Sequence, residues 1–123
     1  MASVTPAMED YLEAVFVLSQ DGPVRVTDLA ERLHIAKPSV HAAMHNLKDS
    51  GFVIQEHYGH ILLTPEGTAR AEQIIRKHRV IKHFLETSLK VPPAQAETEA
   101  CSIEHFLSAE TVESLARFIG YKE

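Results

Sequence analysis

The sequence predicts a mainly α protein: an N-terminal winged helix-turn-helix with a small β-hairpin wing, followed by a helical domain. Three observations predict this fold class. Two short helical patterns are joined by a three-residue link, two β-prone runs flank a turn directly after them, and helical spacing then resumes. We expect the two domains to cover residues 1–66 and 67–123.

The winged part begins with three predicted helices. Apolar residues recur at helical spacing over residues 6–20. Thr27 is a suitable N-cap for a short helix over residues 28–33. Pro38 suits the first turn of the third helix, and Gly51 suits its C-cap. Two short helices this close together are typical of a helix-turn-helix.

The remaining elements are a hairpin and three helices. Residues 52–63 contain two β-prone runs around a turn at residues 58–59, which predicts a β-hairpin. A long helix is expected from residue 64 to about residue 88, where two prolines soon follow. Two further helices are expected, at about residues 94–107 and 109–119.

Composition excludes several classes of protein. The chain has 123 residues, 45% of them hydrophobic, which is enough for a packed core. No apolar run approaches the roughly 18 residues that a membrane span needs, and the N-terminus lacks the pattern of a signal peptide. The single cysteine, Cys101, excludes an intramolecular disulfide and suits a reducing compartment. We therefore expect a cytoplasmic protein.

The net charge of −5 is unevenly distributed. Residues 1–22 contain four acids and no lysine or arginine, and residues 92–123 contain six acids against two basic residues. Residues 66–91 contain six basic residues against three acids. If the two acidic ends meet in space, they form a cation site rather than a surface that repels nucleic acid.

The winged part predicts a DNA-binding surface. In this fold the second helix of the pair enters the major groove with its N-terminal residues leading. Lysine suits a phosphate, whereas hydroxyl, methyl and imidazole groups suit base edges. The residues that we expect to contact DNA are Thr27, Lys37, Pro38, Ser39, His41, Ala42, His45 and, on the wing, Tyr58. The part is only weakly basic, so a protein-binding winged helix is an alternative.

Candidate metal ligands form two groups at helical spacing, together with a histidine in the long helix. They are Asp10 and Glu13; Cys101, Glu104 and His105; and His78. Carboxylates, imidazoles and one thiolate in this number suit octahedral Mn²⁺ or Fe²⁺ better than a tetrahedral structural zinc. The alternative is that each group belongs to an ordinary solvated helix face.

Four stretches of the chain resemble one known family, the diphtheria toxin repressors, which include the manganese transport regulators. Residues 8–13 (MEDYLE) are similar to the family's opening helix, and residues 37–40 (KPSV) to the start of its recognition helix. Residues 76–79 (RKHR) and 99–105 (EACSIEH) resemble its two later metal-binding stretches. The match runs in order over nearly the whole chain, and the last stretch is the most specific.

This resemblance implies a function as well as a fold. It implies a helical dimerisation domain, a homodimer on a palindromic operator in double-stranded DNA, and repression of metal-uptake genes when the metal is plentiful. It implies a divalent ion, Mn²⁺ or Fe²⁺, held by Asp10, Glu13, His78, Cys101, Glu104 and His105. It implies no enzymatic activity, no small-molecule substrate and no membrane.

The chain departs from both metal-specific types within the family. Asp10 and Glu13 resemble the manganese-responsive members, whereas Cys101 resembles the iron-responsive ones. Lys82 and Glu97 stand where the second site of the iron repressors has glutamate and histidine, although Glu97 can still ligate a metal. The residues therefore leave the choice between Mn²⁺ and Fe²⁺ open.

Two further functions compete with metal-dependent repression. A metalloenzyme needs an open coordination position and a substrate cleft, for which a short chain with a winged helix leaves little room. A redox-responsive regulator would use Cys101 directly, and a Cys101→Ser variant would then lose its response to oxidant.

Overall fold

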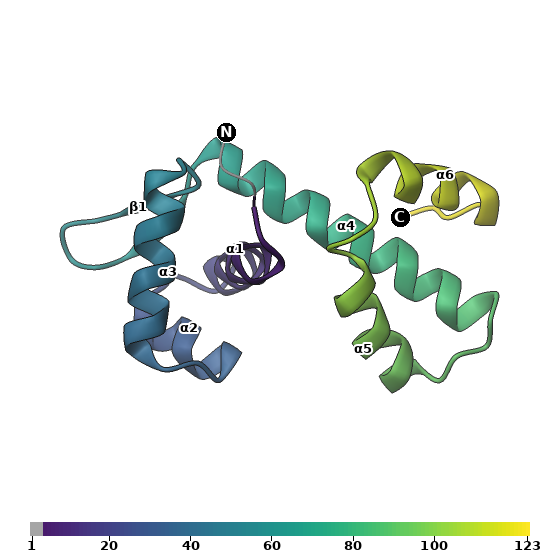
Figure 1. The fold of residues 1–123 in the computed structure, drawn as a ribbon, viewed down its shortest axis with the longest axis horizontal. Coiled ribbons are helices and arrows are strands. Elements are labelled where there is room, and N and C mark those ends of the chain that lie inside the picture. Colours follow the sequence, from purple (N-terminus) through teal and green to yellow (C-terminus); the bar gives the residue numbers. More distant parts are fainter. Residues whose placement is uncertain (1–3) are drawn as a thin grey trace. The chain divides into compact units, whose positions relative to one another are not determined.

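The computed structural model describes residues 4–123 and divides into two compact units, up to Glu72 and from Gln73 onward. The elements in chain order (Figure 1) are α1 (Pro6–Ser19), α2 (Val26–Leu33), α3 (Lys37–Asp49), β1 (Val53–Gln55), β2 (Ile61–Leu63), α4 (Pro65–Thr87), α5 (Pro93–Ile103) and α6 (Ala109–Ile119). The predicted fold class is confirmed. Residues 1–3 lie outside the described residues. They belong to the N-terminal segment in which the sequence shows no signal-peptide pattern. None of the described helices is both long and apolar enough to span a membrane.

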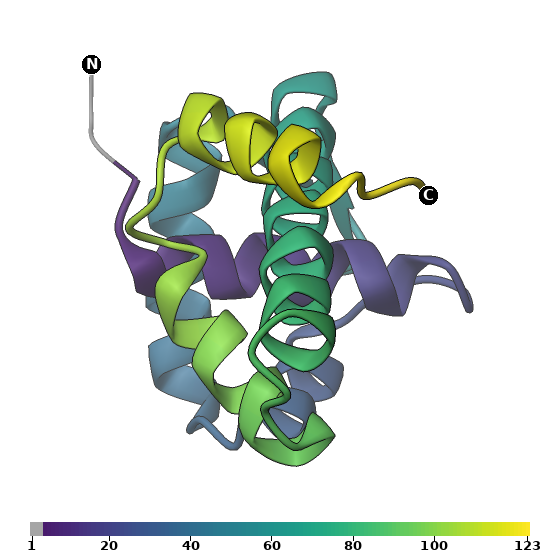
Figure 2. The same cartoon turned by 90° about the vertical axis from the view of Figure 1, so that its right-hand side faces the viewer.

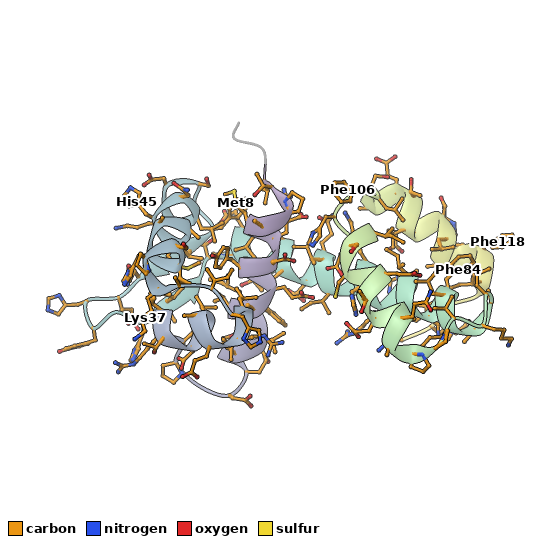
Figure 3. All side chains as sticks on the ribbon, turned by 60° about the horizontal axis from the view of Figure 1, so that its bottom comes forward. Met8, Lys37, His45, Phe84, Phe106 and Phe118 are labelled. Carbon is orange, nitrogen blue, oxygen red and sulfur yellow. The ribbon has the colours of Figure 1, made fainter. Side chains whose placement is uncertain are left out.

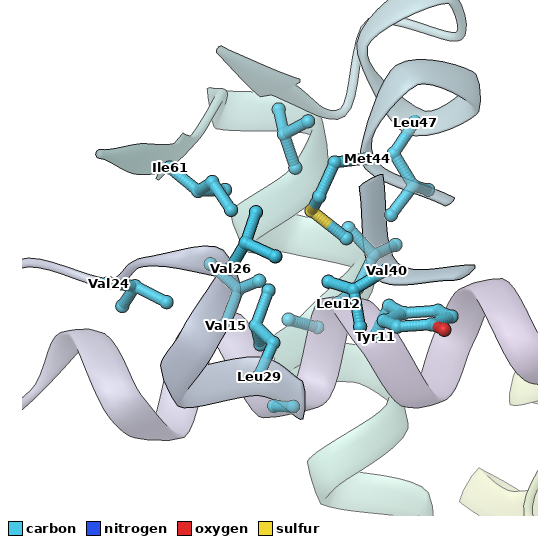
Figure 4. Packing of buried hydrophobic residues seen from close by; sticks show 13 residues of the cluster. Tyr11, Leu12, Val15, Val24, Val26, Leu29, Val40, Met44, Leu47 and Ile61 are labelled. Atoms are coloured by element: carbon cyan, nitrogen blue, oxygen red, sulfur yellow. The ribbon is translucent and has the colours of Figure 1, made fainter. Parts of the chain in front are cut away.

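The core of the first unit lies between three helices and the hairpin. Leu12 and Val15 of α1, Leu29 of α2 and Val40 of α3 have no exposed surface, and Ile61 of β2 packs with them. Figure 4 shows these side chains converging from their separate elements. Burial of each such side chain contributes about 1.5–3 kcal/mol to folding. The core therefore holds α3 by one face and leaves its other face exposed.

The hairpin forms the wing. Strands β1 and β2 are antiparallel, with Ile54 opposite Leu62. Gly59 adopts a φ of +85° in the connecting turn, a conformation that glycine adopts without strain. The amide of Ile61 donates a hydrogen bond of 2.8 Å to the carbonyl of Val24, which anchors the hairpin to the segment before α2. Figure 1 shows the loop between the strands projecting beyond α3.

Two helix ends in this unit differ from the prediction. Thr27 is not the N-cap of α2: the Asp28 carboxylate accepts a 2.9 Å hydrogen bond from the backbone amide of Arg25, so the helix is capped two residues earlier. The C-cap of α3 is Ser50, and Gly51 follows it with a φ of +83°. The left-handed residue that ends α3 is therefore one position outside the cap.

The second unit packs α5 and α6 against the later part of α4, as Figure 2 shows. Val80 of α4, Ala96 and Ala100 of α5 and Val112 of α6 are completely or almost completely buried in one cluster. The alanines are small, so α5 approaches α4 closely. This close approach brings the residues next to them on α5 within reach of α4.

Helix α5 ends four residues before the predicted end at residue 107. Its last residue is Ile103, Glu104 is the C-cap, and a turn follows. The buried ammonium of Lys77 on α4 donates a 2.8 Å hydrogen bond to the carbonyl of Leu107. This contact between α4 and the turn is a tertiary interaction, and the local apolar spacing contains no sign of it.

Candidate metal centre and nucleic-acid interface

His78 on α4 is the centre of a cluster of metal-ligating groups. Its Nδ1 lies 2.7 Å from Oε1 of Glu104, and its Nε2 lies 2.8 Å from Oε2 of Glu97. The Cys101 Sγ lies 3.8 Å from His78 Nδ1 and 3.5 Å from Glu97 Oε2. The possible ligand atoms of His78, Glu97 and Cys101 all lie within 4.8 Å of one another. Both nitrogens of one imidazole are thus engaged by carboxylates.

Helix geometry places the α5 members of this cluster. Glu97 and Cys101 are four residues apart on α5 and therefore share a face. Each directly follows one of the buried alanines, Ala96 and Ala100, through which α5 packs on α4. Glu104 reaches His78 from the C-cap of α5, so it approaches from the end of the helix.

The cluster raises the pKa of its histidine and lowers the pKa of one glutamate, so both shifts favour the charged form. The hydrogen bond with Glu104 is the main cause that raises the pKa of His78 above its ordinary 6.5, and the Glu97 carboxylate adds to it. The hydrogen bond from Lys82 is the main cause that lowers the pKa of Glu97. The metal-free cluster therefore favours a protonated imidazole between two carboxylates. A metal ion has to displace that proton, because only a neutral imidazole is a ligand.

One observation shows that these residues fit a cation. Glu104 is 1% exposed, and its Oε2 is buried with no hydrogen-bond partner among the described residues. Buried carboxylate oxygens in proteins are nearly always satisfied, so this oxygen offers an unused position that a cation can fill. Carboxylates, an imidazole and a thiol are together a donor set for a divalent transition metal.

The six predicted ligands fall into both units. His78, Cys101 and Glu104 meet in the second unit, and His105 is half-buried in the turn after α5. Asp10, which is exposed, and Glu13, which is half-buried, belong to α1 in the first unit. The described contacts thus bring three of the six predicted ligands together, all in the second unit.

Glu97 was not among the six predicted ligands, yet it belongs to the cluster. Its spacing of four residues from Cys101 is the sequence signal that points to it. That signal alone does not separate a ligand from a solvated glutamate, because the contact with His78 depends on how α5 packs on α4.

The predicted DNA-contacting side of α3 is exposed. The residues on it are Lys37, Pro38, Ser39, His41, Ala42 and His45, whereas Val40, Met44 and Leu47 face the core. Figure 3 shows Lys37 and His45 towards opposite ends of the helix. Thr27 is exposed in the first turn of α2, and Tyr58 at the tip of the wing is 80% exposed. The first unit thus presents a polar helix face and an aromatic wing tip to solvent.

The second unit exposes two large aromatic side chains. Phe106, in the turn after α5, is 78% exposed, and Phe118 on α6 is 84% exposed. Figure 3 labels both side chains together with Phe84, which is half-buried. Exposed apolar side chains mark an interface where they form a contiguous patch.

Two family models together match almost the whole chain. Residues 3–61 match the iron-dependent repressor, N-terminal DNA-binding domain. Residues 64–123 match the iron-dependent repressor, metal-binding and dimerisation domain. The metal cluster and the exposed phenylalanines lie in the second matched range, and α3 lies in the first.

Individual relatives agree with the family models. The chain is 36% identical over 118 residues to an HTH-type transcriptional regulator of Methanocaldococcus jannaschii. That alignment covers 94% of each chain. It is 30% identical over 120 residues to the HTH-type transcriptional regulator MntR of Listeria monocytogenes, covering 97% of this chain and 84% of that one. Its structure is similar to that of the manganese regulator SloR, with a TM-score of 0.84 and 30% identity. That match covers 98% of this chain, which spans about half (56%) of the SloR chain.

Proposed function

Since the chain belongs to the diphtheria toxin repressor family of metal-dependent transcriptional repressors, we propose that it is a homodimer that binds a palindromic operator when Mn²⁺ or Fe²⁺ is bound. We assign DNA binding to residues 1–66 and metal binding with dimerisation to residues 67–123. The observation that carries the metal assignment is the buried Glu104 oxygen without a partner, beside His78.

We assign the metal to residues of both units. His78, Cys101, Glu104 and His105 are the ligands from the second unit, and Asp10 and Glu13 are the ligands from α1. A bound divalent ion supplies positive charge that neutralises the carboxylates. Ligands from two units couple occupancy of the site to the position of the DNA-binding unit.

The DNA-binding unit reads its operator through α3. Lys37, in the first turn, pairs with a phosphate, and the helix N-terminus favours the same charge. Ser39, His41, Ala42 and His45 face base edges in the major groove. Tyr58 on the wing and Thr27 on α2 contact the flanking backbone.

A homodimer accounts for the exposed aromatic residues of the second unit. Phe106 and Phe118 belong to the dimer interface and lose most of their exposed surface to a second copy. A two-fold axis then sets the two α3 helices about one DNA turn apart, ~34 Å, to match a palindrome.

The proposed ligands include groups that favour each of the two metals. The hard carboxylates of Asp10 and Glu13 favour Mn²⁺, and the soft thiol of Cys101 favours Fe²⁺. The similar protein SloR is named a manganese regulator. We infer a repressor of metal-uptake genes that responds to one of these two ions.

Fluorescence anisotropy tests the proposed function. The protein is titrated onto a duplex from the region upstream of its own gene, with Mn²⁺, with Fe²⁺ under anaerobic conditions, with Zn²⁺, or with a chelator. Tight binding only with metal is expected, and the order of the metals identifies the activating ion. Equally tight binding in chelator contradicts the metal switch. Absence of binding in every condition favours a protein-interaction module.

A Cys101→Ser variant separates metal sensing from redox sensing. The proposed repressor keeps its metal response with altered metal preference, because the thiol is one ligand among several. Loss of an oxidant response in this variant, with an unchanged metal response, would support the redox-responsive regulator.

A further inference from the structure

Lys82 shares one carboxylate with the metal cluster. It lies one helical turn after His78 on α4, and its Nζ is 3.0 Å from Oε1 of Glu97. The other oxygen of Glu97 lies 2.8 Å from His78 Nε2 and 3.5 Å from the Cys101 Sγ. A single carboxylate is therefore held by an ammonium group on one side and by two possible metal ligands on the other.

We propose that Lys82 is a built-in competitor of the metal: its ammonium holds Glu97 and lowers the affinity of the His78 cluster for a divalent ion. This inference rests on the proposed function, because it requires that the cluster binds a metal. The positive charge acts in two ways. It holds the Glu97 carboxylate beside His78, where that carboxylate could otherwise ligate or neutralise a metal ion, and it repels a second cation in the same cluster.

The consequence is a repressor that responds only when its metal is abundant. A weaker site stays empty at low metal concentration and fills when the concentration rises. The Lys82 side chain is 33% exposed, so its repulsion acts partly through water and weakens as salt increases. Salt dependence is thus a signature of the charge itself.

The test compares the metal affinity of the full-length protein with that of a Lys82→Gln variant. Mn²⁺ binding is measured by competition with a chelator of known affinity. Co²⁺ binding is followed by its thiolate absorption band, which reports Cys101 directly. We expect Lys82→Gln to bind both ions roughly three- to tenfold more tightly at low salt, with a smaller difference at high salt.

Two control variants isolate the effect of the charge at this position. Lys82→Arg keeps the charge and is expected to bind metal like the wild type. Lys90→Gln removes the same charge from an exposed site beyond the end of α4, and it is expected to leave the metal affinity unchanged. Thermal unfolding of the metal-free variants reports any change in stability separately.

The direction in which Lys82→Gln changes the metal affinity decides between the two roles of Lys82. If the Lys82–Glu97 pair only holds the fold together, Lys82→Gln loosens Glu97, and metal binding is unchanged or weaker; either outcome overturns the proposal. If the wild-type protein binds neither Mn²⁺ nor Co²⁺, the proposed function fails and this inference fails with it. Tighter binding by Lys82→Gln but not by Lys82→Arg supports the competitor role.

Discussion

Replacing Glu104 with glutamine changes metal affinity and folding stability by very different amounts. Glutamine keeps the shape of the side chain and the oxygen that accepts from His78 at 2.7 Å. In the metal-free protein the hydrogen bond from His78 remains but no longer has a charged acceptor, which is a loss of about 1–2 kcal/mol. It also removes a buried, half-satisfied carboxylate, whose desolvation costs several kcal/mol. The two terms oppose each other, so we expect the free energy of unfolding to change by no more than about 2 kcal/mol.

In the same variant the metal site loses an anionic ligand, and no favourable change compensates for the lost metal affinity. Loss of outer-shell partners alone typically weakens metal binding about 10- to 100-fold, so loss of Glu104 as a ligand is expected to weaken it at least that much. Isothermal titration with Mn²⁺ measures the affinity, and urea unfolding in chelator measures the stability. Val112→Ala is the control, because it opens a cavity in the same buried cluster without touching a ligand. An unchanged Mn²⁺ affinity in Glu104→Gln would refute the assignment of Glu104 as a ligand.

Three further predictions concern the fold, the pH dependence and the DNA surface. Gly67→Ala is expected to lower the free energy of unfolding in urea by about 1–3 kcal/mol, because its methyl group would overlap the carbonyl oxygen of Phe52. In metal-free protein, protonated His78 stabilises the fold fully below pH 6.5, and this stabilisation is lost as the pH rises through the raised pKa of His78. Urea unfolding of His78→Gln at a series of pH values should show that this part of the pH dependence of stability is gone. Lys37→Gln is expected to weaken binding to all duplexes alike and to reduce the slope of log K against log salt by about 0.9, so an unchanged slope would contradict its phosphate contact.

Local patterns predicted the winged unit well because its elements obey local rules. The spacing of Leu12 and Val15, and of Val40 and Met44, follows the helical period, and those residues are buried. Gly59 marks the turn of the hairpin, where the backbone has a positive φ. In these elements, burial and turn geometry follow from residues close together in the chain.

The cluster around His78 depends on contacts that no local pattern contains. The Lys77 hydrogen bond holds the turn after α5, which places Glu104 at the helix end rather than on an exposed face. Glu97 enters the cluster because α5 packs closely on α4 through small residues. A glutamate at helical spacing is usually solvated, so only the tertiary structure distinguishes Glu97 and Glu104 from an ordinary surface pair.

If metal and DNA each change the affinity of the protein for the other, the Mn²⁺ affinity must differ between the free protein and the protein bound to its operator duplex. Coupling between two binding sites is reciprocal. We expect the duplex to tighten Mn²⁺ binding by a factor within the usual range of about 5- to 150-fold, and Mn²⁺ to tighten duplex binding by the same factor. Equal Mn²⁺ affinities with and without the duplex would contradict this coupling.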